Sequence, residues 1–203
     1  LEFSLDGVFD APPGSEFVIL EAPGQITDMF GSVIGADLPG PTALALVREA
    51  DLLFARVVPD TQAGAQWLRE EVPTGSALPQ IGGGRLRDVT IDEAFAGASA
   101  VGLLDDSLLS NVTIDIDVTP IDAAGRNVAL NVPGALTLNG RLIVDPAGTF
   151  NSARVVLGEA GTVSGTGEFV LRTPAGRPGQ DVARAFLQFS PGASGQQRLD
   201  FDE

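Results

Sequence analysis

The heptapeptide LRDVTID at residues 86–92 recurs as LSNVTID at residues 109–115, an offset of 23 residues. An offset of this size, with a strand in each copy, is about one coil of a parallel β-helix. From residue 112 to residue 118 apolar and polar side chains alternate, as in a strand with one buried face. The alternative is that two similar strands occur in a β-sandwich. We therefore predict an all-β fold, either a parallel β-helix-like solenoid or a β-sandwich, with one or two short helices.

Short β-branched runs separated by Gly and Pro extend through the whole chain, which holds 25 Gly and 14 Pro. This punctuation is typical of many short strands joined by tight turns. Residues 42–58 fit either a helix or a hairpin, and the β-rich surroundings favour the hairpin, with strands at 43–47 and 52–58. The other predicted strands cover residues 3–5, 17–20, 88–92, 111–118, 127–131, 135–144, 154–157, 167–171 and 185–189.

Two features organise the chain into a first and a second part. The stretch AGAQWLREE at residues 63–71 lies between Pro59 and Pro73 and carries good helix formers, so it predicts a short helix. The run Gly82-Gly83-Gly84, which follows Pro73 and Pro79, is typical of a linker or turn and is the best candidate boundary. We therefore expect a β-rich module at 1–80, with its helix near 63–71, and a β-strand-repeat, solenoid-like module at 81–203.

The composition excludes most common catalytic machinery. The chain has no Cys and no His, and all 12 basic residues are Arg. Disulfides, thiol and Ser-His-Asp catalysis, and lysine Schiff bases are therefore absent. The net charge of −15 repels phosphate backbones and anionic headgroups, so we expect no nucleic-acid partner. No apolar run approaches the roughly 20 residues that span a bilayer, so we expect no membrane insertion.

Several motifs resemble bacterial exported β-strand-repeat proteins, namely autotransporter-passenger and filamentous-haemagglutinin-like adhesins. LTLNG at residues 136–140 and SGTG at residues 164–167 match two successive strand steps of that group. PGSEFVIL at 13–20, followed by ITDMF at 26–30, resembles another of its recurring elements, with Asp28 where a Gly is usual. The resemblance implies an exported solenoid, extracellular or at the cell surface. It carries no catalytic residues.

Four aspartates are candidate ligands for a structural calcium ion. If the 23-residue repeat is one coil, Asp92 stacks over Asp115 at about 4.8 Å, and Asp117 and Asp122 add oxygens nearby. Calcium takes about six to eight such oxygens. The alternative is that Asp92, Asp115, Asp117 and Asp122 are solvated, outward-facing side chains. Calcium is the only cofactor that the sequence brings into consideration.

A polysaccharide-cleaving enzyme would have to use carboxylates and Arg alone. Residues two apart on a strand point to the same side, so Asp115 and Asp117 could form a carboxylate pair, with Arg87 or Arg141 beside them. Sugar clefts also usually offer aromatic platforms, whereas this chain is 6% aromatic, with one Trp and no Tyr. We therefore expect no enzyme activity.

The expected function is structural. The chain begins Leu1-Glu2-Phe3 and not with Met, which predicts a processed or excised piece. LEFSLD at residues 1–6 also resembles LDFDE at residues 199–203, as if the chain were cut across a repeat. We expect a self-assembling surface, matrix or fibre-forming subunit that joins copies of itself through chain ends and strand edges. The alternatives are an adhesion module that binds a glycan or host surface and, third, a carbohydrate-active β-helix enzyme.

Overall fold

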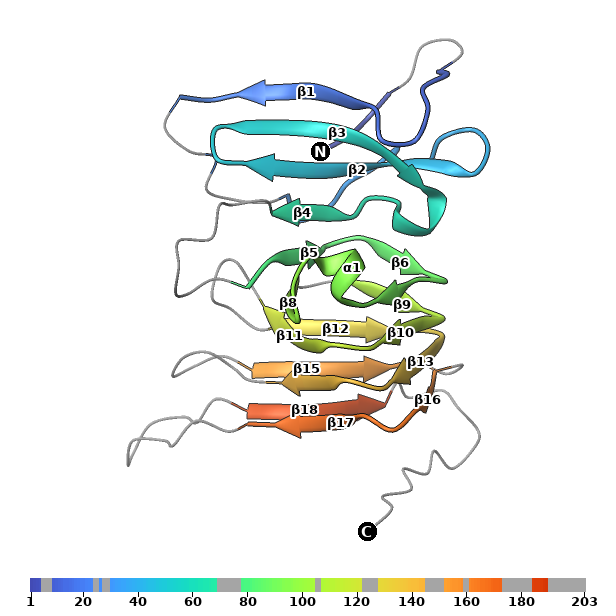
Figure 1. The fold of residues 1–203 in the computed structure, drawn as a ribbon, viewed down its shortest axis with the longest axis vertical. Coiled ribbons are helices and arrows are strands. Elements are labelled where there is room, and N and C mark those ends of the chain that lie inside the picture. Colours follow the sequence, from blue (N-terminus) through green and yellow to red (C-terminus); the bar gives the residue numbers. More distant parts are fainter. Residues whose placement is uncertain are drawn as a thin grey trace.

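The computed structural model is an all-β solenoid, and Figure 1 shows its strands stacked along one long axis. The structure describes residues 1–4, 9–23, 26, 30–68, 78–104, 107–121, 128–144, 152–158, 161–172 and 184–189. The prediction of a parallel β-helix-like fold is confirmed, and the β-sandwich alternative is not. The resemblance between residues 1–6 and 199–203 lies largely outside the described residues.

The first part of the chain forms strands that extend the longest sheet beyond the coils. Its elements are β1 (Glu16–Glu21), β2 (Thr42–Glu49), β3 (Leu52–Pro59), the 3-10 helix η1 (Asp60–Gln62), β4 (Gln66–Leu68) and β5 (Gln80–Gly82). The hairpin prediction is confirmed, because β2 and β3 pair in antiparallel fashion from end to end.

Four turns of solenoid follow, each contributing one strand to each of three sheets, and a last strand at residues 184–189 extends one of these sheets. The elements are β6 (Arg85–Arg87), β7 (Thr90–Ile91), the helix α1 (Glu93–Ala96), β8 (Ala100–Leu104), β9 (Leu108–Ser110), β10 (Val112–Ile114), β11 (Asp117–Ile121), β12 (Val128–Val132), β13 (Ala135–Leu138), β14 (Arg141–Val144), β15 (Ser152–Leu157), β16 (Thr162–Ser164), β17 (Glu168–Leu171) and β18 (Arg184–Phe189).

The three sheets differ in length. The four-stranded sheet has the order β16-β13-β10-β7, and the five-stranded sheet has the order β18-β15-β12-β9-β6. The nine-stranded sheet has the order β1-β3-β2-β4-β5-β8-β11-β14-β17. Only this sheet continues to the N-terminal end of the molecule, so β1 is its last strand there (Figure 1).

The 23-residue repeat sets the register of the coils as predicted. Thr113 and Ile114 of β10 lie opposite Thr90 and Ile91 of β7 in a parallel ladder. Because side chains alternate along a strand, Ile91 and Ile114 point inward and Thr90 and Thr113 outward. Both isoleucines are fully buried.

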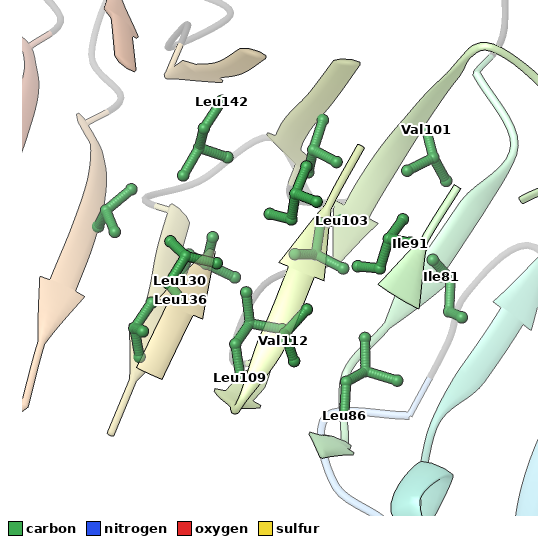
Figure 2. Close-up of a cluster of buried hydrophobic side chains, with 14 of the residues drawn as sticks. Ile81, Leu86, Ile91, Val101, Leu103, Leu109, Val112, Leu130, Leu136 and Leu142 are labelled. Carbon is green, nitrogen blue, oxygen red and sulfur yellow. The ribbon is translucent and has the colours of Figure 1, made fainter. Parts of the chain in front are cut away.

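The core is a column of stacked aliphatic side chains enclosed by the three sheets (Figure 2). One stack continues from Ile91 through Ile114 to Leu138 on the four-stranded sheet. Another joins Val118 and Leu142 on the nine-stranded sheet. Each coil therefore buries its apolar side chains mainly against the coils directly above and below it.

The helix predicted over residues 63–71 is wrong for the part that the structure describes. Residues 66–68 form β4, where Trp67 pairs with Val47 on one side and Ile81 on the other. Strand pairing and burial of Trp67 against the core outweigh the helix propensity of this stretch. Residues 69–71 lie outside the described residues.

The division into modules at 1–80 and 81–203 remains a prediction. β5 spans residues 80–82, and its pairing with β4 and β8 continues the nine-stranded sheet across that point. Ala43 and Ala45 of β2 also belong to the same buried cluster as the coil residues.

Candidate functional site: an open sheet edge and a polar ladder

The most unusual surface of the molecule is β1, an exposed apolar strand at the edge of a sheet. Its sequence is EFVILE, and every one of its six residues is exposed. The exposed fractions are 43% for Phe17, 64% for Val18, 38% for Ile19 and 46% for Leu20. On one side β1 pairs with β3, and no strand among the described residues lies on its other side. Exposed strands at a sheet edge invite association with another strand, and proteins usually protect them with charged residues or Pro.

Side-chain contacts hold β1 in place against the rest of the molecule. Arg56 of β3 donates from Nε to a Glu16 carboxylate oxygen at 2.7 Å. On the other face of the strand, the rings of Phe9 and Phe17 lie 5.6 Å apart, a common distance for a tilted aromatic pair. The apolar edge is therefore a fixed part of the fold and has a defined shape.

The opposite edge of the same sheet has a similar sequence. β17 reads EFVL at residues 168–171, against EFVIL at residues 16–20 in β1. Phe169 of β17 packs against the core, whereas Leu171 is 49% exposed. The nine-stranded sheet thus ends in an apolar strand on both sides within the described part of the chain.

A second regular feature is a ladder of polar side chains on the outer face of the four-stranded sheet. Thr90, Thr113, Thr137 and Ser164 occupy the same position on four successive strands. Neighbouring strands lie about 4.8 Å apart, so the hydroxyl groups form a straight, evenly spaced row. The row is accessible, since Thr90 and Ser164 are exposed and the two residues between them are half-buried.

Asx side chains flank the hydroxyl row at the corners of the coils. Asp88 and Asn111 both adopt a left-handed backbone with φ of 55°, which Asp and Asn tolerate better than most residues. The Asn111 amide donates to the Asp88 carboxylate at 3.0 Å, and the Asn139 amide donates to Asp115 at 2.8 Å. These bonds between successive coils fix the side chains in rows.

The structure does not gather the predicted calcium ligands into one site among the described residues. The Asp92 carboxylate caps α1 by accepting from the Phe95 amide at 2.8 Å, whereas Asp115 binds Asn139. No group of three or more acidic side chains within the described ranges is arranged to hold a metal ion. Asp122 lies outside those ranges, so the calcium site stays a prediction.

Asp117 is paired with Arg141 one coil further on. The Arg141 Nε donates to a carboxylate oxygen of Asp117 at 2.9 Å. This hydrogen bond, opposed in part by desolvation, lowers the pKa of the Asp117 carboxyl from its ordinary value. A lowered folded-state pKa stabilises the protein above the pKa of the unfolded chain, and that contribution is lost as the pH falls through the folded-state pKa.

The carboxylate pair considered for sugar cleavage is divided between two strands. Asp115 directly follows β10 in the four-stranded sheet, and Asp117 begins β11 in the nine-stranded sheet. The chain turns between them, so they do not share one strand face as predicted. Arg87 is paired too, with Asp60 at 2.6 Å.

A pocket of about 410 Å³ lies between residues 31–37 and the first coils. Small and apolar residues form most of its walls, and its two charged side chains are Asp37 and Arg85. These two pair with each other at 2.7 Å. The pocket thus has no surplus charge to attract an ionic ligand.

Comparison of the chain with protein-family models, with curated protein sequences and with solved structures gives no match in any of the three. The likeness to exported adhesins therefore rests on the quoted motifs alone. The described part of the chain has no helix with the length and apolar character needed to cross a bilayer.

Proposed function

We propose that this protein is a non-enzymatic structural subunit, exported to the cell surface or an extracellular matrix, which assembles with copies of itself. The observation that carries the proposal is the apolar edge strand β1, exposed along its whole length. An isolated molecule would leave the four apolar side chains in the middle of β1 exposed to water. Association with another copy through this edge buries those apolar side chains.

The distribution of charge supports association at edges and opposes it elsewhere. The net charge of −15 makes the sides of neighbouring molecules repel each other. In β1 the charges are confined to the two ends, at Glu16 and Glu21, and the four residues between them are apolar. Contacts through the strand edge are therefore favoured over contacts through the acidic sides.

Placing a charge in the middle of β1 should dissociate the assembly. We expect wild-type protein to show a mass well above 20.9 kDa by light scattering at high protein concentration. The Val18→Glu variant should have the monomer mass. Val18 is 64% exposed in the single chain, so the substitution leaves the fold intact. In the assembly the new carboxylate would be buried at the interface, which is costly.

The matched control is Leu108→Glu, which adds the same charge to a strand residue that is 45% exposed. Leu108 lies in β9, which pairs with β6 on one side and with β12 on the other. The Leu108→Glu variant should therefore assemble to the same mass as wild type. A monomeric wild type at every concentration would overturn the proposal. Repeating the measurement with calcium and then with a chelator tests whether calcium bridges the copies.

A second candidate function, adhesion to a neutral glycan, is favoured by the hydroxyl row on the four-stranded sheet. Evenly spaced hydroxyl groups, held rigid by neighbouring hydrogen bonds, suit a polymer that presents hydroxyl groups at regular intervals. The Thr113→Val, Thr137→Val double variant keeps the shape of the side chains and removes two hydroxyls from the row. We expect it to lose binding to a panel of neutral polysaccharides (cellulose, chitin and xylan) in pull-down assays.

The control for that assay is Thr119→Val, because Thr119 lies in β11 of a different sheet. If the double variant binds the polysaccharides as well as wild type does, adhesion through this face is contradicted. It is also contradicted if wild type binds none of the polysaccharides in the panel.

A further inference from the structure

We propose that Asn139 is a modification site, at which spontaneous deamidation to aspartate or isoaspartate weakens the contact between two successive coils. Asn139 is the only Asn of the chain that Gly follows, and the structure leaves it exposed. It directly follows β13 of the four-stranded sheet, whereas β1 belongs to the nine-stranded sheet. The site is therefore independent of the proposed self-assembly through β1.

The reaction needs only the chain itself, hydroxide and water. The Gly140 nitrogen gives its proton to hydroxide and attacks the side-chain carbon Cγ of Asn139. A bond from this nitrogen to Cγ forms, the bond from Cγ to Nδ2 breaks, and the leaving group takes a proton from water and departs as ammonia. Water then opens the resulting succinimide ring at one of its two carbonyls, which gives aspartate or isoaspartate. Gly140 favours the attack, because it has no Cβ to crowd its nitrogen.

The folded coil holds the reacting groups in place. The backbone amides of Asn139 and Gly140 both donate to the Ile114 carbonyl, at 2.8 Å and 2.9 Å. The side-chain amide of Asn139 donates to the Asp115 carboxylate at 2.8 Å. In the folded chain the attacking nitrogen thus keeps its proton, and the group that would leave is hydrogen-bonded too. Deamidation therefore requires this corner to open locally.

Asn139 is the one uncharged member of an otherwise acidic column. The strand registers pair Ile91 with Ile114 and Ile114 with Leu138, and the residues that follow these three are Asp92, Asp115 and Asn139. The three therefore occupy the same position on successive coils, about 4.8 Å apart. Deamidation would remove the donor that Asp115 accepts from and set a like charge beside it. Water screens part of this repulsion, since Asn139 and Asp115 are both exposed.

The isoaspartate product also disturbs the backbone. In isoaspartate the chain continues through the side-chain carbon, so the backbone between residues 139 and 140 is one carbon longer. The corner has little space for this carbon, because a Cβ added at Gly140 would lie 2.8 Å from the Ile116 nitrogen. The two amide bonds to the Ile114 carbonyl cannot both be kept at the greater length. We therefore expect the isoaspartate form to be less stable than the aspartate form.

Incubation at mildly alkaline pH, followed by peptide mapping with mass spectrometry, tests the modification site. Asn139 should convert at least about tenfold faster in urea than in the folded chain, since the hydrogen bonds of the corner are absent in urea. Asn111 is the internal control: its amide also donates to a carboxylate, that of Asp88 at 3.0 Å, but Val follows it. No conversion of Asn139 in urea, or equal rates in urea and in the folded chain, would overturn the proposal.

Encoded variants test the contact between the coils. Asn139→Asp should lower the urea midpoint of unfolding below that of wild type. The double variant Asp115→Asn, Asn139→Asp should recover most of this loss, because an amide and a carboxylate again face each other with their places exchanged. A double variant no more stable than Asn139→Asp would show that charge at this contact is not the cause of the loss and would overturn that part of the proposal.

The modified wild-type chain provides the deciding measurement. After conversion in urea and refolding, chains that carry aspartate should unfold at the same urea concentration as the Asn139→Asp variant. Chains that carry isoaspartate should unfold at a lower concentration still. Modified chains as stable as unmodified ones would overturn the proposal that deamidation at Asn139 weakens the coil contact.

Discussion

Shortening Ile114 to alanine should lower the free energy of unfolding by about 3 kcal/mol. Ile114 is fully buried and stacks directly between Ile91 of the previous coil and Leu138 of the next. Truncating a buried Ile to Ala typically costs about 2–5 kcal/mol, because the lost transfer energy adds to the cavity left behind. Regular strand ladders above and below limit how far the site collapses. Urea denaturation followed by Trp67 fluorescence and far-UV circular dichroism measures the change.

The neighbouring residue provides the control for that experiment. Thr113 lies in the same strand but points outward, so Thr113→Ala should cost less than about 1 kcal/mol. Similar losses for the two variants would contradict the inward orientation of Ile114. They would also contradict the coil register that follows from the 23-residue repeat.

The solenoid could be predicted because its repeat is visible in the sequence. Two nearly identical heptapeptides 23 residues apart stack in the structure with Thr90 opposite Thr113 and Ile91 opposite Ile114. The local apolar–polar alternation and the stacking of the two repeats predict the same arrangement. When local and long-range preferences agree in this way, the fold can be predicted from the sequence.

The corners of the coil were harder to predict. The sequence predicts one strand over residues 111–118, since apolar and polar residues alternate from residue 112 to residue 118. The chain instead leaves β10 at Ile114 and starts β11 at Asp117. Ile116 lies in the corner but is only 8% exposed, so its side chain still belongs to the core. The apolar–polar alternation therefore continues through a bend at which the chain passes from one sheet to another. Asp115 and Asp117 lie on either side of this bend, so their carboxylates do not share a strand face.

The edge position of β1 has no signal in the sequence. EFVILE reads as a buried strand, and the prediction of a strand at 17–20 is confirmed by β1. Whether such a strand is internal or terminal depends on which other strands pair with it. That is decided by β3, some 35 residues away, and not by residues 16–21. The candidate site could therefore be identified only from the strand order in the structure.

Adding a single methyl group at Gly140 should destabilise the protein by about 2–3 kcal/mol, nearly as much as the cavity at Ile114. Gly140 lies at the corner between β13 and β14, where its amide donates to the Ile114 carbonyl at 2.9 Å. A Cβ at this position would lie 2.6 Å from the backbone carbon of Ile116 and 2.8 Å from its nitrogen. Backbone atoms cannot rotate away, so the coils must separate, and overpacking of this kind typically costs about 1–3 kcal/mol.

The control for Gly140→Ala is Gly31→Ala, because a Cβ at Gly31 meets no atom within 4 Å and the residue has no positive φ. The free energy of unfolding of the Gly31→Ala variant should be unchanged or raised by up to about 1 kcal/mol, since alanine restricts the unfolded chain more than glycine does. Urea denaturation of both variants separates close coil packing from the general effect of replacing a glycine. Equal stabilities would mean that successive coils at this corner lie further apart than the Ile116–Gly140 contact requires. The stack that positions β1 at its N-terminal end would then be looser than the strand registers indicate.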